Sequence, residues 1–323
     1  MRILVTGGAG FIGSNLVEEL LKYNRVQLVR VFDNLATGSR QNIEEFFSDS
    51  KFQFIEGDIR DFDTCVEACE GIDLVSHQAA LGSVPRSIHD PITTNEVNVT
   101  GTLNIFTAAK NNKIKRVVYA SSSSVYGDHP DLPKKEENTG NLLSPYAVSK
   151  AVNELYAQVY AHVFQMEFIG LRYFNVFGPK QNPEGPYAAV MPLFVNALLN
   201  RHAPVINGDG QHSRDFTFVT NAVEANTRAL FTENKNAVNQ VYNIAYGKQT
   251  TLLQLMDHLQ NISGIKVSIQ HGPERTGDVK HSHADISKAK SLLGYDPNVS
   301  VEEGLRETFE WYKERKEKVE VKV

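Results

Sequence analysis

Residues 6–14 read TGGAGFIGS, and this glycine-rich stretch decides the fold. It follows the apolar run RILVT and leads into the helical pattern SNLVEELLKY. In that context Gly7 permits a tight turn, Gly10 lets a pyrophosphate approach the backbone, and Gly13 lets the helix pack closely against the sheet. The free N–H groups at the start of the helix would then bind the phosphates. The stretch therefore predicts a dinucleotide site.

Two acidic segments extend this prediction. VFDNL ends the second apolar run with Asp33, twenty residues after Gly13. A carboxylate at that point accepts hydrogen bonds from both hydroxyls of an adenosine ribose and repels a 2′-phosphate, so NAD is favoured over NADP. EGDIR places Asp58 and Ile59 at the end of the next apolar run, where an adenine could lie.

Short β-branched runs alternate with helix-length segments as far as about residue 173. This alternation predicts an α/β fold with a doubly wound parallel sheet, the Rossmann arrangement. Beyond it, NVFGPKQNPEGPY is a Pro and Gly loop, and later strands such as SRDFTFV are irregularly spaced. We expect an NAD-binding domain over 1–174 and a smaller C-terminal α/β lobe over 175–323 that binds the substrate, with the chain crossing back to the first domain.

Composition narrows the class of protein. The 323 residues carry a formal net charge of -5 and are 41% hydrophobic, and no apolar run approaches the length of a membrane span. We therefore expect a cytoplasmic protein with neither nucleic acid nor a membrane as partner. Cys65 and Cys69 stand four residues apart with no histidine nearby, which favours two unpaired thiols on a helix face and no metal site.

The segment SPYAVSKAVNEL indicates a proton-transfer site. Tyr146 and Lys150 share a helix face at this spacing, and a nearby cation favours the phenolate and lowers the pKa of tyrosine. In isolation this pattern is usually an ordinary helix. The serine run in YASSSSVYG, at a strand end where ligands bind in such sheets, favours the functional interpretation. Ser122 or Ser123 could share a substrate hydroxyl's proton with Tyr146.

TGGAGFIGS, YASSSSVYG and YAVSK, in this order and spacing, resemble the extended short-chain dehydrogenase/reductase family over essentially the whole chain. The resemblance implies a metal-free redox site in which Tyr146 is the base, Lys150 lowers its pKa and holds the nicotinamide ribose, and Ser122 or Ser123 assists. It adds further residues to the NAD site: Phe11, Ile12, Asn34, Gly38, Gln78, Ala79 and Ala80.

The family contains epimerases, dehydratases, decarboxylases and reductases of nucleotide sugars. Dehydratases carry an Asp–Glu pair where this chain has Ser123 and Ser124, and the carboxylate and arginine of decarboxylases are not clearly present. LGSVPRS, LSPYAVSK, INGDGQHSRDF and TGDVKHS resemble the UDP-N-acetylglucosamine 4-epimerases. The resemblance implies interconversion of UDP-N-acetylglucosamine and UDP-N-acetylgalactosamine through a 4-keto intermediate, with UDP-glucose left open as a slower substrate.

Three alternatives stay open. The chain could be a UDP-glucose 4-epimerase proper, or another nucleotide-sugar reductase or decarboxylase of the family. A dinucleotide sensor without catalysis is also conceivable, although such proteins tend to lose the tyrosine and lysine that are present here.

The same resemblance makes the second lobe a UDP-sugar-binding lobe. Arg214 and Arg275 would bind the pyrophosphate, which suits their fork-shaped guanidinium groups, and Asp278 would bind the uridine ribose. Ser282 matches a position near the C2 substituent of the sugar, where a small residue leaves room for an acetamido group. Other matching positions are Gly82, Ser83, Ser124, Asn175, Gln181 and Ala189 for the sugar pocket, with Val190, Val205 and Asn207 for the sugar and uracil walls.

The resemblance also implies an assembly. The helices expected around residues 94–110 and 144–164 resemble those that pair across a family homodimer as a four-helix bundle.

Overall fold

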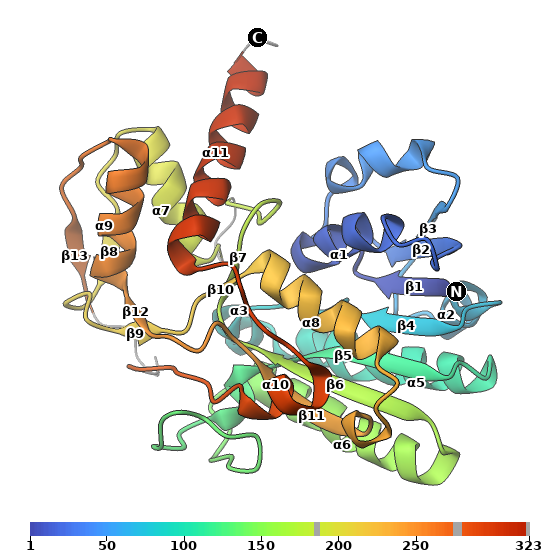
Figure 1. Cartoon of the computed structure of the whole chain (residues 1–323). Helices are drawn as coiled ribbons and strands as arrows, with labels where there is room; N and C mark the ends of the chain where they lie inside the picture. Colours follow the sequence, from blue (N-terminus) through green and yellow to red (C-terminus); the bar gives the residue numbers. More distant parts are fainter. Residues whose placement is uncertain (184–187, 274–279, 321–323) are drawn as a thin grey trace.

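Seven parallel strands form the central sheet of the protein, in the spatial order β11-β6-β5-β4-β1-β2-β3 in the computed structural model (Figure 1). The structure describes residues 1–183, 188–273 and 280–320. The strands are β1 (Arg2–Thr6), β2 (Leu28–Asp33), β3 (Phe52–Glu56), β4 (Leu74–His77), β5 (Arg116–Ser122), β6 (Glu167–Tyr173) and β11 (Gln240–Ile244). The order of the first six is that of a doubly wound sheet, so the predicted fold class is confirmed.

Helices cover both faces of this sheet (Figure 1). Alternate side chains of one strand point to opposite faces, and Ile3 and Val5 of β1 belong to a different hydrophobic cluster from Leu4. The first cluster contains residues of α1 (Phe11–Leu21) and α8 (Val219–Phe231). The second contains residues of α2 (Phe62–Cys69), α5 (Thr102–Asn111) and α6 (Pro145–Phe164).

The connection from β4 to α5 borders the functional site. It forms α3 (Val84–His89), α4 (Pro91–Asn95) and a π-helical turn (Glu96–Gly101) that runs directly into α5. Such π turns inside helices occur frequently at functional sites. This turn contains one fully buried polar residue of the site, Asn98.

The smaller lobe is built mainly from the second half of the chain. Its elements are β7 (Val176–Phe177), α7 (Val190–Leu199), β8 (Val205–Asn207), β9 (Ser213–Arg214), β10 (Thr217–Phe218), β12 (Thr250–Thr251), α9 (Leu252–Ser263), β13 (Gln270–Gly272) and α11 (Val301–Glu320). α8, β11 and α10 (Ser287–Leu293) come from the same half of the sequence but lie in or beside the central sheet. The division into 1–174 and 175–323 stays a prediction.

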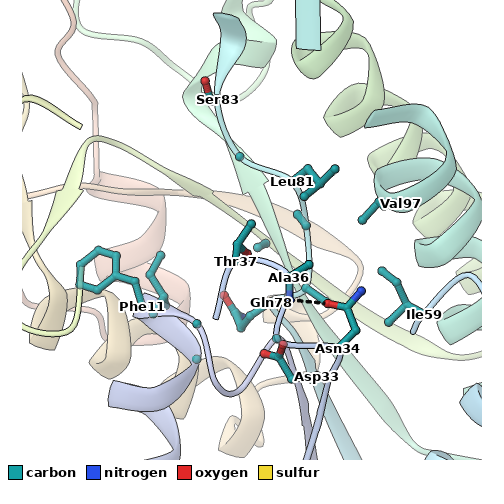
Figure 2. A pocket seen from close by; sticks show the side chains of 18 of the residues that line it. Phe11, Asp33, Asn34, Ala36, Thr37, Ile59, Gln78, Leu81, Ser83 and Val97 are labelled. Atoms are coloured by element: carbon teal, nitrogen blue, oxygen red, sulfur yellow. Dashed lines mark hydrogen bonds between the residues drawn. The ribbon is translucent and has the colours of Figure 1, made fainter. Parts of the chain in front are cut away.

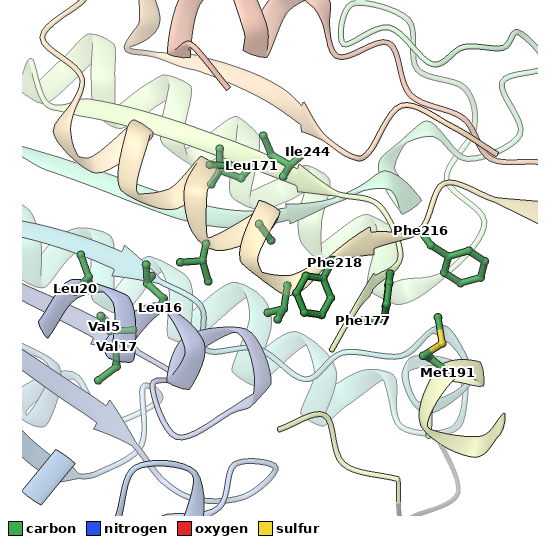
Figure 3. Close-up of a cluster of buried hydrophobic side chains, with 14 of the residues drawn as sticks. Val5, Leu16, Val17, Leu20, Leu171, Phe177, Met191, Phe216, Phe218 and Ile244 are labelled. Atoms are coloured by element: carbon green, nitrogen blue, oxygen red, sulfur yellow. The ribbon is translucent and has the colours of Figure 1, made fainter. Parts of the chain in front are cut away.

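A continuous hydrophobic cluster joins the two parts (Figure 3). Leu16 and Val17 of α1 belong to it together with Phe177, Phe218 and Met191 of the smaller lobe. Burying apolar side chains from both parts in one cluster stabilises their contact. The position of the two parts relative to each other is therefore fixed by packing.

Both cysteines lie buried on α2 as free thiols, and burial raises the pKa of each to about 12. Such thiols are inert at neutral pH. Over the three described stretches of the chain, no helix has the length and apolar character to cross a membrane. Within the same stretches, no three side chains of the His, Cys, Asp and Glu types gather as a metal site.

Candidate active site

The glycine loop between β1 and α1 forms a cradle that side chains would fill. Gly7 has a φ of +66°, and a Cβ on it would lie 2.6 Å from the backbone N of Ala79. A Cβ on Gly13 would lie 2.1 Å from the carbonyl O of Gly7. α1 starts at Phe11, and its N-cap, Gly10, provides no side-chain cap. The N–H groups of the first turn are thus available to an anionic ligand.

Asp33 lies at the end of β2, beside this loop. Its Oδ2 accepts a hydrogen bond from Ala9 N at 2.9 Å, and its Oδ1 accepts one from Leu35 N at 2.8 Å. Burial raises the pKa of the carboxyl, and these backbone donors oppose the shift. Gly10 N is a third backbone donor to this carboxylate, which leaves an acceptor position for a ribose hydroxyl.

A cavity of about 580 Å³ extends from Asp33 to the start of α6. Figure 2 shows Asp33 and Asn34 at one end, Ile59 at the side and Ser83 at the far end. The structure gathers fourteen predicted cofactor residues on its wall: Gly7, Gly10, Phe11, Ile12, Gly13, Asp33, Asn34, Asp58, Ile59, Gln78, Ala79, Ala80, Tyr146 and Lys150. Gly38 is not on the wall. It packs behind the loop, where its Cβ would lie 2.8 Å from the carbonyl C of Ala9. The glycine cradle and Asp33 together fit NAD.

Tyr146 and Lys150 lie in the first turns of α6. Ser144 caps this helix by accepting a hydrogen bond from Ala147 N, and Pro145 occupies its first position, so the start of the helix is well defined. The Nζ of Lys150 lies 5.8 Å from the centre of the Tyr146 ring and donates to the carbonyl O of Ala120 at 3.0 Å. The ammonium is thereby held beside the phenol.

Burial shapes the protonation of this pair. It lowers the pKa of Lys150 to about 8 and raises the pKa of Tyr146. A hydrogen bond from the side chain of Ser122 to the phenol opposes the second shift. The positive charge of Lys150, and that of an oxidised nicotinamide when one is bound, favour the phenolate form of Tyr146.

The structure separates the serines that the sequence left equivalent. Ser122 lines the NAD cavity and also a second cavity, of about 410 Å³. Ser123 and Ser124 line only the second cavity. Ser124 donates from N and from Oγ to the Oγ of Ser122, at 3.1 and 3.0 Å. Of these three serines, Ser122 is therefore the one that lines both cavities. Tyr146 also lines both.

The second cavity lies between the sheet edge and the smaller lobe. The predicted substrate residues on its wall are Ser83, Ser122, Ser123, Ser124, Asn175, Arg214 and Ser282. Gly82 and Gln181 line the NAD cavity instead, while Ala189, Val190, Val205 and Asn207 line neither cavity. Arg275 and Asp278 lie outside the described residues.

Asn175 stands where the two cavities meet, with a φ of +34°. A non-glycine residue with positive φ is uncommon and marks a backbone held in place by its surroundings. Sequence alone could not reveal this conformation.

His77 and Asn98 support the site, and the sequence did not predict their roles. Thr6 Oγ1 lies 2.7 Å from Nδ1 of His77, and Thr102 Oγ1 lies 2.9 Å from its Nε2. Burial lowers the pKa of His77 to about 3, so the ring is neutral. Asn98 accepts from Leu81 N at 2.7 Å and donates to Ser149 Oγ at 3.2 Å. His77 thus links β1 to α5, and Asn98 links the loop after β4 to α6.

Tyr173, at the end of β6, also lines the NAD cavity. Its hydroxyl donates to Gln78 Oε1 at 3.1 Å and accepts from Asn226 Nδ2 at 2.7 Å. Gln78 in turn donates to Asn226 Oδ1 at 2.9 Å. A residue of α8 thus orients two side chains of the cavity wall. No local pattern in the sequence links these three positions.

A doubly wound sheet with this glycine cradle, a buried aspartate at the end of β2 and a Tyr–Lys pair on one helix defines an NAD-dependent enzyme of the extended short-chain dehydrogenase/reductase class. A family model described as NAD dependent epimerase/dehydratase family matches residues 3–245. The chain belongs to the NAD-dependent epimerase/dehydratase family, and its cofactor is NAD.

Relatives with established names fall into several branches of that family. A UDP-glucose 4-epimerase of Mycolicibacterium smegmatis is 35% identical over 317 residues, which cover 98% of this chain and 99% of the relative. The structure of a UDP-N-acetylglucosamine 4-epimerase from Methanobrevibacter ruminantium M1, in complex with UDP-N-acetylmuramic acid, matches with a TM-score of 0.91, 39% identity and coverage of 97% and 98% of the two chains.

A third match contains the cofactor. The structure of a UDP-glucuronic acid 4-epimerase from Bacillus cereus, in complex with UDP-glucuronic acid and NAD, has a TM-score of 0.91 and 34% identity. The match covers 98% of this chain and 100% of that chain.

Proposed function

We propose that the protein is a UDP-sugar 4-epimerase that interconverts UDP-N-acetylglucosamine and UDP-N-acetylgalactosamine, with UDP-glucose as a slower substrate. The observation that carries the proposal is the placement of Tyr146 and Ser122 on the walls of both cavities. A hexose in the second cavity would present its C4 hydroxyl to the phenol and its C4 hydrogen to the nicotinamide end of the first.

When bound, NAD supplies the hydride acceptor and donor for C4, and the overall reaction has no net redox change. Tyr146, as phenolate, accepts the proton of the O4 hydroxyl, and C4 becomes a carbonyl. The hydroxyl of Ser122, which bonds to the phenol in this structure, would turn its one proton to the same oxygen and orient it. After the keto sugar has turned its other face, Tyr146 returns the proton to O4. Lys150 keeps a positive charge beside the phenol throughout.

We expect the UDP part of the substrate to be bound firmly and the sugar to be bound loosely. The guanidinium of Arg214 lines the second cavity and donates to the carbonyl oxygens of Ser213 and Lys280, at 3.0 and 3.1 Å. Planar guanidinium groups suit the oxygens of a diphosphate. Binding energy from the UDP part, remote from C4, would hold the substrate while the sugar turns.

Small side chains on the sugar wall support an N-acetylated hexose. Ser123, Ser124 and Ser282 line the second cavity and leave space and hydroxyl groups for an acetamido substituent. The M. ruminantium structure supports the same preference, since it is a UDP-N-acetylglucosamine 4-epimerase. The M. smegmatis relative instead supports the alternative of a UDP-glucose 4-epimerase proper.

Two measurements test the proposal. The purified protein is incubated separately with UDP-N-acetylglucosamine and UDP-glucose, and the products are identified by NMR. We expect a C4 epimer from both, with a higher kcat/KM for the N-acetylated sugar. An N-acetylated substrate that stays unchanged would contradict the specificity, and net accumulation of reduced cofactor would point to a reductase or decarboxylase.

Two variants locate the base and the sugar pocket. Tyr146→Phe should keep its bound NAD and lose turnover by about 10³-fold or more, because the phenol is the only proton acceptor in the scheme. Tyr156→Phe, on the same helix, is the matched control and should retain full activity. Ser282→Tyr should exclude UDP-N-acetylglucosamine while UDP-glucose still reacts. Equal losses for both sugars would argue against Ser282 as a size filter.

We also propose that the protein is a homodimer. Leu155, Val159 and Val163 recur every fourth residue along α6 and are 60%, 53% and 59% exposed. Ile88 and Ile92, on the neighbouring α3 and α4, are 63% and 72% exposed. An apolar stripe of this kind is typical of a helix face that pairs with a second copy. The two free thiols support a reducing compartment, and we propose the cytoplasm.

A further inference from the structure

A row of buried polar side chains crosses three adjacent strands and begins at Ser121, the first serine of the run. Ser121 of β5 stands opposite Arg172 of β6, and Arg172 stands opposite Asn243 of β11. All three are buried. Polar groups are expensive to bury unless they are hydrogen-bonded, so a continuous row of them at the active-site edge of a sheet calls for an explanation.

Glu154 of α6 balances the positive charge of Arg172, the one charged residue of this row. Its Oε1 accepts from Arg172 Nε at 2.9 Å and its Oε2 from Arg172 Nη2 at 2.8 Å, a bidentate ion pair. The hydroxyl of Ser121 donates to the same Oε1 at 2.5 Å. Glu154 follows Tyr146 and Lys150 at the same four-residue spacing, so the three side chains project from one face of the helix in successive turns.

The consequence is that α6 holds each of the last three residues of β5. Tyr146 bonds to the side chain of Ser122, Lys150 donates to the carbonyl of Ala120, and Glu154 accepts from Ser121. Three contacts in three helical turns fix the strand end along its length. The position of Ser122 relative to the phenol depends on all of them.

Hydrogen bonds connect the Glu154–Arg172 pair to the walls of the second cavity. Arg172 Nη1 donates to the carbonyl O of Glu136 at 3.0 Å, and Glu136 Oε1 accepts from Asn243 N at 2.8 Å. Asn243 Nδ2 donates to the carbonyl oxygens of Lys134 and Asp285, at 2.9 and 3.0 Å. Lys134 lines the second cavity. Asp285 lies three residues after Ser282, which also lines that cavity. The row thus connects the catalytic strand to both of these loops.

A second ion pair, between β5 and β6, provides a comparison. Arg116 of β5 stands opposite Glu167 of β6 at the amino ends of the strands, and its Nε and Nη2 donate to Glu167 Oε2 at 2.8 and 2.6 Å. Its Nη1 donates to the carbonyl oxygens that end α8. Neither residue lines the NAD cavity or the second cavity. The Arg116–Glu167 pair therefore joins β5, β6 and the end of α8, away from the active site.

We propose that Glu154 and Arg172 are positioning residues of the active site. Their pair fixes the end of β5 against the catalytic helix, ties both sugar-pocket loops to it, and keeps the charge behind Tyr146 balanced. The inference rests on the proposed role of Tyr146 as the base.

The pH profile separates this role from a merely structural one. Glu154→Gln leaves the cation of Arg172 unbalanced, which favours the phenolate and shifts the acidic limb of kcat/KM to lower pH. Arg172→Gln leaves a carboxylate instead and shifts the limb to higher pH. Eight helical residues span about 12 Å, and a unit charge at that distance in an effective dielectric of about 20 to 40 shifts a pKa by about 0.5 to 1.

Tyr126, Glu136 and Lys288 are titratable groups that interact with Arg172. Burial keeps Tyr126 protonated, and loss of the Arg172 cation raises the pKa of Glu136 further, toward its neutral form, so we expect the shift of Arg172→Gln to be the smaller of the two.

The remaining charges near Tyr146 stay the same in both variants. In the NAD cavity the titratable or charged groups are Lys150, Tyr173, Asp33, Asp58 and Arg60. In the second cavity they are Lys134, Arg214, His281 and Tyr126. Within the sheet, His77 of β4 is neutral because burial lowers its pKa, and Tyr119 of β5 is protonated because burial raises its pKa. A pair of shifts with opposite signs therefore reports the charge at positions 154 and 172.

The experiment compares Glu154→Gln and Arg172→Gln with Glu167→Gln, the matched control from the Arg116–Glu167 pair. The readouts are the pH profile of kcat/KM and the ultraviolet titration of the Tyr146 phenolate, taken as the difference from Tyr146→Phe. We expect opposite shifts for the first two variants and none for the control. An unshifted Glu154→Gln, or shifts of the same sign, overturns the proposal. The titration needs no turnover, so a protein that epimerises no UDP-sugar would refute the proposed function while this test still decides the pair.

Ser121→Ala provides a second test that leaves the ion pair intact, should either charge variant fail to fold. Without its hydroxyl, residue 121 no longer donates to Glu154, so the end of β5 next to Ser122 loses one of its three contacts with α6. We expect kcat to fall about fivefold to tenfold while KM and bound NAD stay nearly unchanged, because catalysis is sensitive to small displacements of reacting groups. An unchanged kcat would refute the positioning role.

Discussion

Lys150 carries a stability cost that its removal should reveal. Its ammonium is buried, its one hydrogen-bond partner among the described residues is the carbonyl of Ala120, and burial lowers its pKa from 10.5 to about 8. The free energy linked to that change is about 3 kcal/mol at neutral pH. Losing the bond to Ala120 costs about 1 kcal/mol. Lys150→Met should therefore stabilise the NAD-free protein by about 2 kcal/mol at neutral pH while abolishing activity.

The pH dependence follows from the same numbers. Between about pH 8 and pH 10.5, Lys150 binds fewer protons in the folded than in the unfolded state. Stability rises with pH wherever the unfolded state binds more protons. The unmodified protein should thus gain stability across this window through Lys150, and Lys150→Met should lack that contribution.

Urea unfolding followed by circular dichroism measures both effects. The curves are recorded for NAD-free protein at about pH 7 and about pH 9.5, on either side of the folded-state pKa of Lys150. Lys313→Met, which removes an exposed lysine from α11, is the control and should change little. A Lys150→Met variant that is less stable than the unmodified protein at pH 7 would refute the reasoning.

Three further perturbations test the cofactor site and the assembly. Gly13→Ala would place a Cβ 2.1 Å from the carbonyl O of Gly7 and should abolish copurification of NAD, measured by cofactor absorbance after denaturation; full NAD content would contradict the cradle. Asp33→Asn should weaken NAD by about tenfold and reduce its preference over NADP, because hydrogen bonds to a charged acceptor contribute about 1.5 to 3 kcal/mol. Calorimetric titration with both cofactors measures this, and an unchanged ratio would exclude Asp33 as the ribose ligand. Val159→Glu should convert the proposed dimer to a monomer in sedimentation velocity, with Leu193→Glu, an exposed apolar residue of α7, as control; unaltered sedimentation would move the interface elsewhere.

Short-range patterns account for what could be predicted from the sequence. The strand, glycine turn and helix around Gly7 and Gly13 are contiguous, so their geometry follows from local backbone rules. Tyr146 and Lys150 are four residues apart on a helix, a spacing that alone places them on one face. Glu154 continues that spacing by one turn, and its position beside the other two could have been predicted in the same way.

The register of distant strands accounts for what could not be predicted. Arg172 meets Ser121 and Asn243 because three parallel strands align at these positions, and no local pattern specifies that alignment. For the same reason the sequence did not reveal His77 as a neutral link between β1 and α5, or Tyr173 as a partner of Gln78.

The sequence by itself determined the alternation of strands and helices, the glycine loop and the helix that carries Tyr146, because each depends on residues close together in the chain. Only the tertiary structure decided which serine joins the two cavities and which residues form the sugar wall. Ser122 holds that place because the end of β5 is fixed by three contacts from α6. Lys134 and His281 join the wall because hydrogen bonds connect loops that are far apart in the chain.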